Sequence, residues 1–298
     1  MFGTVATKRN WSVAERKIID EGFRRTEQTP RLQMEPDFLF LRHQLKGRSP
    51  RHAIELGYRN LQCCVGLLNL SNGIRWTYRS GAPLVPLGNL LLASTAVLID
   101  PKRKTIGDWV VESHYPHAFK QSFSASSVDL SDLATYTKRW VRQIKRTDFS
   151  DRLTNAIILF QEGLSANQID VALIKFWTCI EMLCARPNQR ESLDRALDRA
   201  SSIFRDQEVA RLRLSFIAES RHTVVHRGEY GDHARQTVQY ALLYASEIIG
   251  FCAFNVHGLR KHSEILDYLS TPRSPERLKE ILKIHRLRLK QISKKKDA

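Results

Sequence analysis

Apolar side chains recur every three to four positions through most of the sequence after Ser150, the spacing that places side chains on one face of an α-helix. The clearest example is the segment from Ile169 to Cys184. Its apolar stripe is formed by Ile169, Ala172, Leu173, Phe176, Ile180, Leu183 and Cys184. A helix with such a stripe has to bury it against other elements. The second half of the sequence therefore predicts an all-α bundle.

Helix stop signals divide this half into further helices. Pro187 ends the helix just described and Gly228 ends another, because proline cannot continue a helix and glycine readily adopts the left-handed conformation of a helix C-cap. The expected helices span residues 152–163, 169–184, 191–204, 208–227, 234–254, 263–269 and 275–292. The last of them is basic and leads into a run of three lysines.

Charged residues in the third of these helices are spaced for local ion pairs. Arg190 and Asp194 are four positions apart, as are Glu191 and Arg195, while Asp194 and Asp198 bring two like charges together. We expect most of them to be solvent-exposed pairs that add little stability.

The first half of the sequence is mixed in character. Helical spacing occurs at residues 13–25 and 52–70, and short apolar stretches typical of strands occur at 90–99 and 106–111. A turn-like Asp100-Pro101-Lys102 separates the two stretches. The expected fold class is therefore α+β overall: a mixed α+β N-terminal domain at residues 1–150 with a sensing or recognition role, followed by the all-α bundle at residues 151–298.

The charge balance favours a polyanionic partner. Lys and Arg outnumber Asp and Glu by 47 to 31, which gives a formal net charge of +16. Nucleic acid and anionic membrane surfaces are partners of this kind. The hydrophobic content of 42% is that of an ordinary globular protein, which excludes disorder over the whole chain.

Neither the cysteines nor the apolar runs indicate a secreted or membrane-spanning protein. Five cysteines are an odd number, and Cys63 and Cys64 are adjacent, so we expect reduced thiols that serve as core residues. Residues 238–254 include Gln239 and Glu247 and fall short of the roughly 20 apolar residues of a spanning helix, so a buried helix is expected there. The expectation is a cytoplasmic protein without a membrane partner.

The segment from Glu219 to Gly228 carries the strongest candidate chemistry. Arg221 is followed five positions later by His226. A guanidinium can hold a phosphate by two hydrogen bonds and offset charge that develops on its oxygens. An imidazole can take a proton from a ribose 2′-hydroxyl or give one to a leaving 5′-oxygen. RNA supplies its own nucleophile, so this chemistry needs no metal or other cofactor.

The spacing of the two residues adds a constraint. Five residues along a regular helix turn the two side chains about 140° apart. Arg221 and His226 of one unbroken helix therefore do not face a single phosphate. Either the helix breaks near His226, or a second copy of the chain completes the site across a two-fold axis.

This element resembles the signature of the HEPN superfamily, an Arg followed after a short spacer by a His. His222 fits the polar position that commonly follows the family's arginine. The helix at 169–184, with the motif Phe-Trp-Thr-x-Ile-Glu that ends in Glu181, resembles together with the preceding helix at 152–163 the opening helices of the ApeA-like HEPN branch. The similarity extends over residues 152–254.

The resemblance implies a helical bundle that forms a homodimer and brings two Arg-x4-His elements into one cleft. It implies a metal-independent endoribonuclease, often in a toxin or antiphage role, and we expect its cleavage to leave 2′,3′-cyclic phosphate ends. A toxin that a regulatory partner protein holds silent is a further possibility. His226 would be the acid and base, Arg221 the phosphate clamp and His222 a supporting polar group. The family also implies that Glu181 orients the catalytic pair. Some members do not cleave, so a non-catalytic module that dimerises or binds RNA or a partner is the alternative.

A purely structural interpretation of the same residues is also open. Arg221 could cap helix carbonyls or pair with Glu219 or Glu181, and His226 could be a hydrogen-bonded histidine at a helix end, because ionic networks often imitate sites.

A metal site has less support. His222 and His226 are four positions apart, as in a zinc-binding helix, but Thr223 stands where the HExxH motif has its glutamate. His233 is the one further ligand in view, and we expect no metal.

Basic residues outside the motif are candidates for contact with RNA. Arg227 adjoins the histidine, and Arg139, Trp140 and Arg142 form a basic segment with an aromatic residue between the arginines. Such segments also occur as ordinary solvated faces. Glycine-rich phosphate loops and a nucleophile elbow are missing from the sequence, so nucleotide hydrolysis and acyl transfer have no support.

Overall fold

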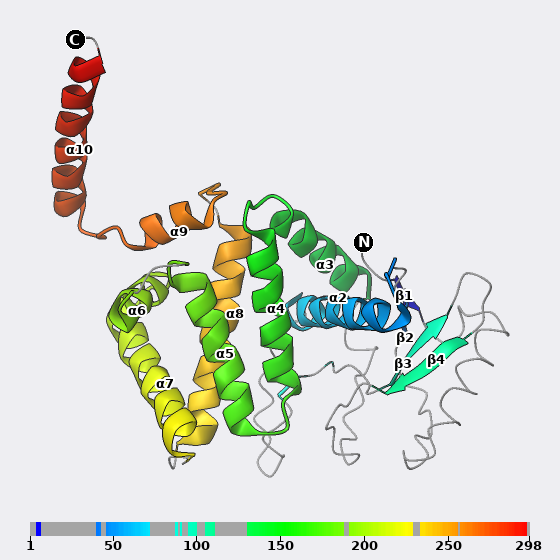
Figure 1. The fold of residues 1–298 in the computed structure, drawn as a ribbon. Coiled ribbons are helices and arrows are strands. Elements are labelled where there is room, and N and C mark those ends of the chain that lie inside the picture. Colours follow the sequence, from blue (N-terminus) through cyan, green and yellow to red (C-terminus); the bar gives the residue numbers. More distant parts are fainter. Residues whose placement is uncertain are drawn as a thin grey trace.

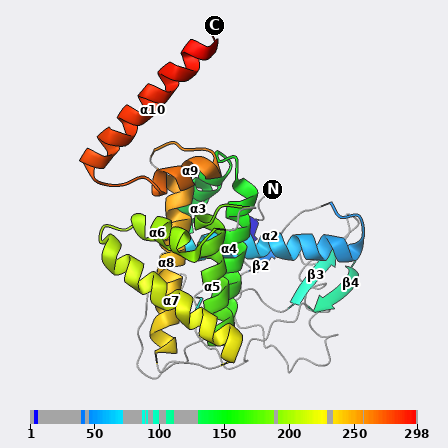
Figure 2. The same ribbon diagram turned by 60° about the vertical axis from the view of Figure 1, so that its left-hand side comes forward.

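The computed structural model describes residues 4–6, 40–42, 46–71, 87–88, 90, 95–99, 105–110, 130–187, 191–228, 233–255 and 257–296. Most of these residues are helical (Figures 1 and 2). The helices are α2 (Pro50–Ser71), α3 (Leu130–Ile144), α4 (Ser150–Ser165), α5 (Ile169–Cys184), α6 (Leu193–Ser202), α7 (Gln207–Arg227), α8 (Ala234–Phe254), α9 (His262–Leu269) and α10 (Pro275–Lys296). The strands are β1 (Thr4–Ala6), β2 (Phe40–Arg42), β3 (Thr95–Ile99) and β4 (Thr105–Val110).

The expected α+β fold, with a mixed domain at 1–150 ahead of the bundle, is wrong: the described structure is mainly α-helical. The strands have three to six residues and form two antiparallel pairs, β1 with β2 and β3 with β4. A two-stranded sheet is too small to form a layer of a domain on its own. The predicted strands at 90–99 and 106–111 are present as β3 and β4, but their short pattern could not show how small the sheet is.

Two further helix expectations concern the first half of the chain. The helix predicted at 52–70 is present as α2. Helix α3 was not predicted, although Leu133, Trp140 and Ile144 recur at helical spacing and form its buried face. The helix predicted at 13–25 lies outside the described residues.

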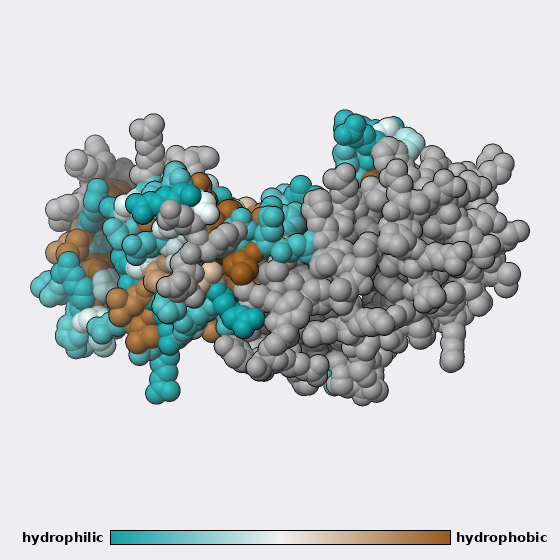
Figure 3. All heavy atoms as spheres, turned by 90° about the horizontal axis from the view of Figure 1, so that it is seen from below, coloured by the Kyte–Doolittle hydropathy of each residue, from teal (hydrophilic) through white to brown (hydrophobic). Residues whose placement is uncertain are grey.

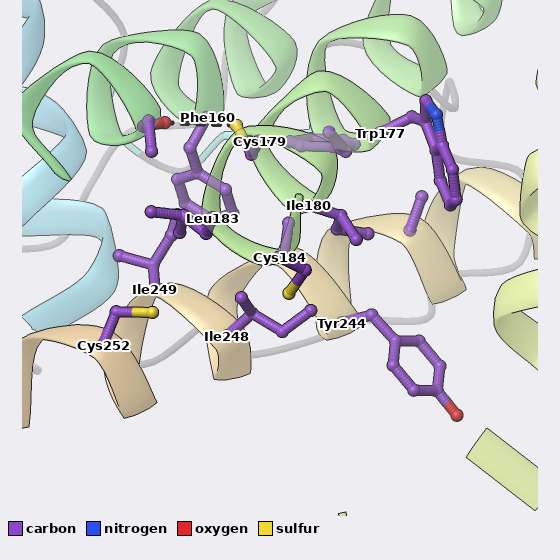
Figure 4. Close-up of a cluster of buried hydrophobic side chains, with 14 of the residues drawn as sticks. Phe160, Trp177, Cys179, Ile180, Leu183, Cys184, Tyr244, Ile248, Ile249 and Cys252 are labelled. Atoms are coloured by element: carbon purple, nitrogen blue, oxygen red, sulfur yellow. Dashed lines mark hydrogen bonds between the residues drawn. The ribbon is translucent and has the colours of Figure 1, made fainter. Parts of the chain in front are cut away.

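Helix α5 is the centre of the bundle. It packs against α4 on one side and α8 on the other, and α6 and α7 also contact it. Figure 4 shows Ile180 and Leu183 of α5 facing Ile248 and Ile249 of α8. All four side chains are almost completely buried, and each such burial contributes on the order of 1.5–3 kcal/mol to folding.

The cysteines and the most apolar long helix both belong to this core. All five cysteines are free and four are buried, which confirms the expectation that they serve as core residues. Burial raises the pKa of Cys63 and Cys252 to about 12, so these thiols stay protonated at neutral pH. Among the described helices, α8 alone is long and apolar enough to span a membrane, but 56% of its apolar window is buried inside the bundle.

Helices α2 and α3 extend the same core across residue 150. Leu67 of α2 and Trp140 of α3 belong to the core cluster. Gly66 lets α2 approach α4 closely, and the Asn69 side chain, just beyond it, donates a 2.7 Å hydrogen bond to the Gln161 side chain of α4. The helices on both sides of residue 150 therefore share one hydrophobic interior.

The charged residues of α6 pair across elements rather than locally. Arg199 donates a 2.6 Å hydrogen bond to Glu191 and a 2.9 Å bond to the Cys184 carbonyl oxygen, and both charged side chains are only 5% exposed. Asp194 and Asp198 both accept bonds from Arg211 of α7, at 2.8 and 2.7 Å. Glu191 therefore pairs with Arg199 and not with Arg195 as expected, because the fold brings Arg199 closer. The expected pair of Arg190 and Asp194 includes Arg190, which lies outside the described residues.

We predict that Gly66→Ala lowers the free energy of unfolding by about 1–2 kcal/mol. A Cβ at this position would lie 2.9 Å from Ile157 Cγ2 and 3.0 Å from the Ile157 carbonyl oxygen. This overpacking costs about 1–3 kcal/mol, more than the gain of about 1 kcal/mol in helix propensity. Urea denaturation measures the change. Gly250→Ala is the control, because its Cβ would meet only Trp140 at 3.9 Å, and we expect no loss there. Equal losses in both variants would contradict the close approach of α2.

We also predict a pH-dependent stability difference at Glu191. The hydrogen bond from Arg199 lowers the pKa of Glu191 from 4.5 to about 2. A lowered pKa in the folded state stabilises the protein above pH 4.5, and this stabilisation is lost as the pH falls towards 2. Glu191→Gln should therefore be less stable than the parent by about 3 kcal/mol at neutral pH, and the gap should narrow through this range.

Denaturant unfolding at a series of pH values measures this gap. Glu55→Gln is the control, because Glu55 pairs with Arg51 in solvent and should contribute no more than about 0.5 kcal/mol. If the difference in free energy of unfolding between the parent and Glu191→Gln stays constant down to pH 2, Arg199 does not lower the pKa of Glu191 in the folded protein.

Candidate functional site

Helix α7 is unbroken from Gln207 to Arg227. It begins at Asp206, whose side chain accepts a 3.1 Å hydrogen bond from the Val209 N–H. It ends at Gly228, which has a positive φ of 66° and donates to the Val224 carbonyl oxygen at 3.1 Å, as the sequence predicted. The helix therefore does not break near His226, and one of the two ways of joining Arg221 to His226 is excluded.

The side chain of Arg221 lies at the edge of the bundle core. Leu214 and Ile217 form the buried face of α7, and the helical repeat places Arg221 on the continuation of this line. The residue is half-buried, and its Nε atom is buried without a hydrogen-bond partner among the described residues. Within this part of the chain Arg221 also forms no ion pair with Glu219 or Glu181. The interpretation of Arg221 as a member of an ionic network has no support here.

His222 and His226 form an exposed pair of imidazoles. Both residues are solvent-exposed, and their ring centroids are 4.3 Å apart with an angle of 48° between the ring planes. Neither ring hydrogen-bonds to a residue of the described ranges, so nothing in this part of the chain supports the interpretation of His226 as a hydrogen-bonded histidine of the helix end. Arg227, the next residue, is also exposed. Both imidazoles can be reached from solvent.

Glu181 lies at the opposite end of the bundle from this pair. The Leu183 carbonyl oxygen near the end of α5 is 2.9 Å from Nε2 of His262, at the start of α9. The last turn of α7, which holds His226, lies beside the opposite end of α8, the end where that helix begins (Figures 1 and 2). Within one copy of the chain, Glu181 therefore does not contact Arg221 or His226.

The basic segment of α3 is also separate from the histidines. Trp140 is only 8% exposed, and its ring packs edge-on against Phe254, the last residue of α8, with centroids 4.5 Å apart. The Arg139 guanidinium carbon lies 5.2 Å from the centroid of the same Phe254 ring. Arg142 is exposed. The structure therefore leaves the two arginines accessible and buries the aromatic ring between them.

Sequence reasoning missed two polar groups at the same end of the bundle as Arg221. The side-chain oxygens Oδ1 of Asn167 and Asp170 are buried without a donor among the described residues. Both residues lie at the turn from α4 to α5, at the lower end of the bundle in Figures 1 and 2. Asn167 comes just before the predicted helix at 169–184 and Asp170 lies in its first turn, a pattern typical of a helix start, so it indicated no other role for them. Buried polar atoms without partners are uncommon in folded proteins.

The outer face of α7 carries large apolar side chains. Val209, Leu212 and Phe216 lie on one line opposite the core, and Leu212 is 72% exposed. Seen from below, the helical side of the molecule shows hydrophobic patches between hydrophilic ones (Figure 3). The line runs along α7 towards the turns that hold His222 and His226.

The remaining features do not add to this site. The described ranges contain no group of three or more His, Cys, Asp or Glu side chains placed to hold a metal ion. An open hollow of about 830 Å³ lies at the other end of α7. Arg211, one of its lining residues, forms ion pairs with Asp194 and Asp198. The hollow is lined by Asp198, Arg205, Asp206, Gln207, Glu208 and Arg211.

No protein-family model, curated protein or solved structure matches this chain.

We predict that Arg221→Met leaves the free energy of unfolding within about 1 kcal/mol of the parent, because the Nε atom makes no hydrogen bond that the substitution could remove. Chemical denaturation monitored by circular dichroism measures it. The matched control is Arg199→Met, which removes a buried pair and should cost about 3 kcal/mol. A loss at Arg221 as large as that at Arg199 would assign Arg221 a structural role.

Proposed function

We propose that the protein is a metal-independent endoribonuclease of the HEPN type that acts as a homodimer. One observation carries the proposal: two exposed imidazoles, and a guanidinium without a partner among the described residues, occur together in the last turns of the unbroken helix α7. These are the groups that cleavage of RNA by its own 2′-hydroxyl requires.

The proposed reaction is an internal transfer at phosphorus. His226 accepts the proton of the ribose 2′-hydroxyl, and the 2′-oxygen attacks the neighbouring phosphorus. The bond from phosphorus to the 5′-oxygen breaks, and an imidazolium returns a proton to that oxygen. Arg221 binds the phosphate oxygens and stabilises their charge in the transition state. The products are a 2′,3′-cyclic phosphate end and a 5′-hydroxyl end.

A second copy of the chain completes the site in this proposal. Because α7 is regular, the side chains of Arg221 and His226 diverge by about 140°. Arg221 of one copy and His226 of the other therefore act on one phosphate. The exposed line of Val209, Leu212 and Phe216 supports this arrangement, because large apolar side chains gathered on a surface often mark an interface.

The charge of the chain supports RNA as the substrate. The formal net charge is +16, and Arg227 exposes a further cation directly beside the imidazole pair. Contacts to phosphates make binding strongly dependent on salt. A toxin or antiphage role is the biological setting that the HEPN resemblance implies, and a regulatory partner protein that holds the toxin silent is a further possibility.

We predict that His226→Ala lowers the rate of RNA cleavage at least about 100-fold, the usual contribution of a general acid or base. The measurement uses labelled RNA and purified protein in EDTA, with analysis of the ends for cyclic phosphate. His257→Ala is the control, because His257 is exposed and follows the far end of α8. The His257→Ala variant should cleave RNA at the rate of the parent. Unchanged cleavage by His226→Ala would refute the assignment.

The alternative is a non-catalytic module that binds RNA or a partner protein. The distance between Glu181 and the histidines favours it, because the orienting carboxylate expected from the family is missing from the site of a single copy. This alternative predicts that RNA stays intact and that salt-sensitive binding survives Arg221→Ala.

A further inference from the structure

Helix α10 projects away from the bundle (Figures 1 and 2). Among the side chains that the structure describes, no hydrophobic residue of α10 belongs to the hydrophobic core or packs against it. At 22 residues it is about 33 Å long. It nevertheless exposes large apolar side chains along its whole length, namely Leu278, Leu282, Ile284, Leu287, Leu289 and Ile292.

Most of these apolar residues share one face of the helix. The helical repeat of 100° per residue places four of these six, Leu278, Leu282, Leu289 and Ile292, within an arc of about 100°. Between Leu278 and Ile292 the same arc contains the half-buried Ile281 and one polar residue, His285. Leu287 lies on the opposite face, about 140° from Leu282, with nearly the same exposure, 54% against 50%. The apolar arc is as wide as the buried face of an ordinary amphipathic helix, but no part of the bundle core covers it.

The rest of the helix is basic. Its sequence contains nine Lys and Arg residues and two Glu. Arg286, Lys279 and Lys283 follow one edge of the apolar arc, and Arg288 borders the other edge. Cations therefore flank the apolar arc on both sides.

We propose that α10 binds the surface of an anionic lipid bilayer and lies in the plane of that surface. An anionic bilayer satisfies both features at once: the apolar arc enters the boundary between headgroups and acyl chains, and the flanking cations meet anionic headgroups. Long Lys and Arg side chains can bury their stems and keep their charges at the headgroups. The sequence analysis expected no membrane partner because it found no membrane-spanning segment. A helix that lies on the membrane surface does not need such a segment, so this partner is compatible with that observation.

Charge and polarity disfavour two other occupants. A second copy of α10 would bring nine cationic residues against nine more, with only two Glu residues on each helix to offset them. RNA would engage the cations but would leave the apolar arc in water, because phosphate contacts do not use it. Of these three occupants, only the anionic bilayer both buries the apolar arc and pairs with the flanking cations.

The test measures co-sedimentation of the full-length protein with phosphatidylcholine vesicles that contain or lack about 30% phosphatidylserine, at physiological ionic strength. We expect the parent to bind the phosphatidylserine vesicles and not the pure phosphatidylcholine vesicles. Leu282→Ser should weaken binding about tenfold, because it removes one buried leucine side chain. Leu287→Ser, the matched control on the opposite face, should stay within about twofold of the parent. Lys279→Gln combined with Lys283→Gln should also weaken binding about tenfold.

Several outcomes would overturn the proposal. One is that the parent binds neither vesicle type, or binds both equally. Another is that Leu282→Ser and Leu287→Ser weaken binding to the same degree. Binding of RNA that depends on Lys279 and Lys283 but not on Leu282, without binding to vesicles, would assign the helix to nucleic acid. A dimer in solution that Leu282→Ser dissociates, again without binding to vesicles, would assign it to a second copy. Thermal unfolding checks each variant, and because α10 lies outside the core we expect no change in Tm.

Discussion

The packing of α5 along α8 determines the position of the other described helices. Ile180 and Leu183 meet Ile248 and Ile249 in an interface without water-exposed surface, and α4, α6 and α7 surround it. Because α7 must turn Leu214 and Ile217 towards this core, the helical repeat fixes the direction of every other side chain on α7. His222 and His226 face solvent for this reason, and Arg221 lies at the boundary between core and surface.

Local patterns in the sequence were sufficient to find the helices of the second half. The bounds of α5 and α8 agree with the predicted segments, because apolar periodicity and the stop signals at Pro187 and Gly228 act within a few residues. Contacts between distant residues were not accessible in this way. The fold class failed because a short strand pattern looks the same in a hairpin and in a larger sheet. The sequence predicted that Glu191 pairs with Arg195, four positions away. In the structure Glu191 pairs with Arg199 instead, a contact that only the folded chain creates.

The candidate site was predictable in its chemistry but not in its geometry. The sequence supplied the Arg221–His226 pair and the angle of about 140° between the two side chains. It could not show that the helix stays regular through His226, that the Nε atom of Arg221 lacks a partner, or that Glu181 lies at the other end of the bundle. Asn167 and Asp170 escaped notice because their pattern is also that of a helix start. The excess of basic residues has two consequences in this account, since α7 is proposed to act on RNA and α10 to bind lipid.

The central claim is that Arg221 of one copy and His226 of another form a single site. Mixing inactive Arg221→Met with inactive His226→Ala under conditions of subunit exchange tests this claim most directly. Random exchange makes half of the dimers mixed, and each mixed dimer contains one intact pairing, so the account predicts recovery of about a quarter of the parent's RNA cleavage. A mixture as inactive as either variant alone, in which mass measurement shows that mixed dimers have formed, would contradict it.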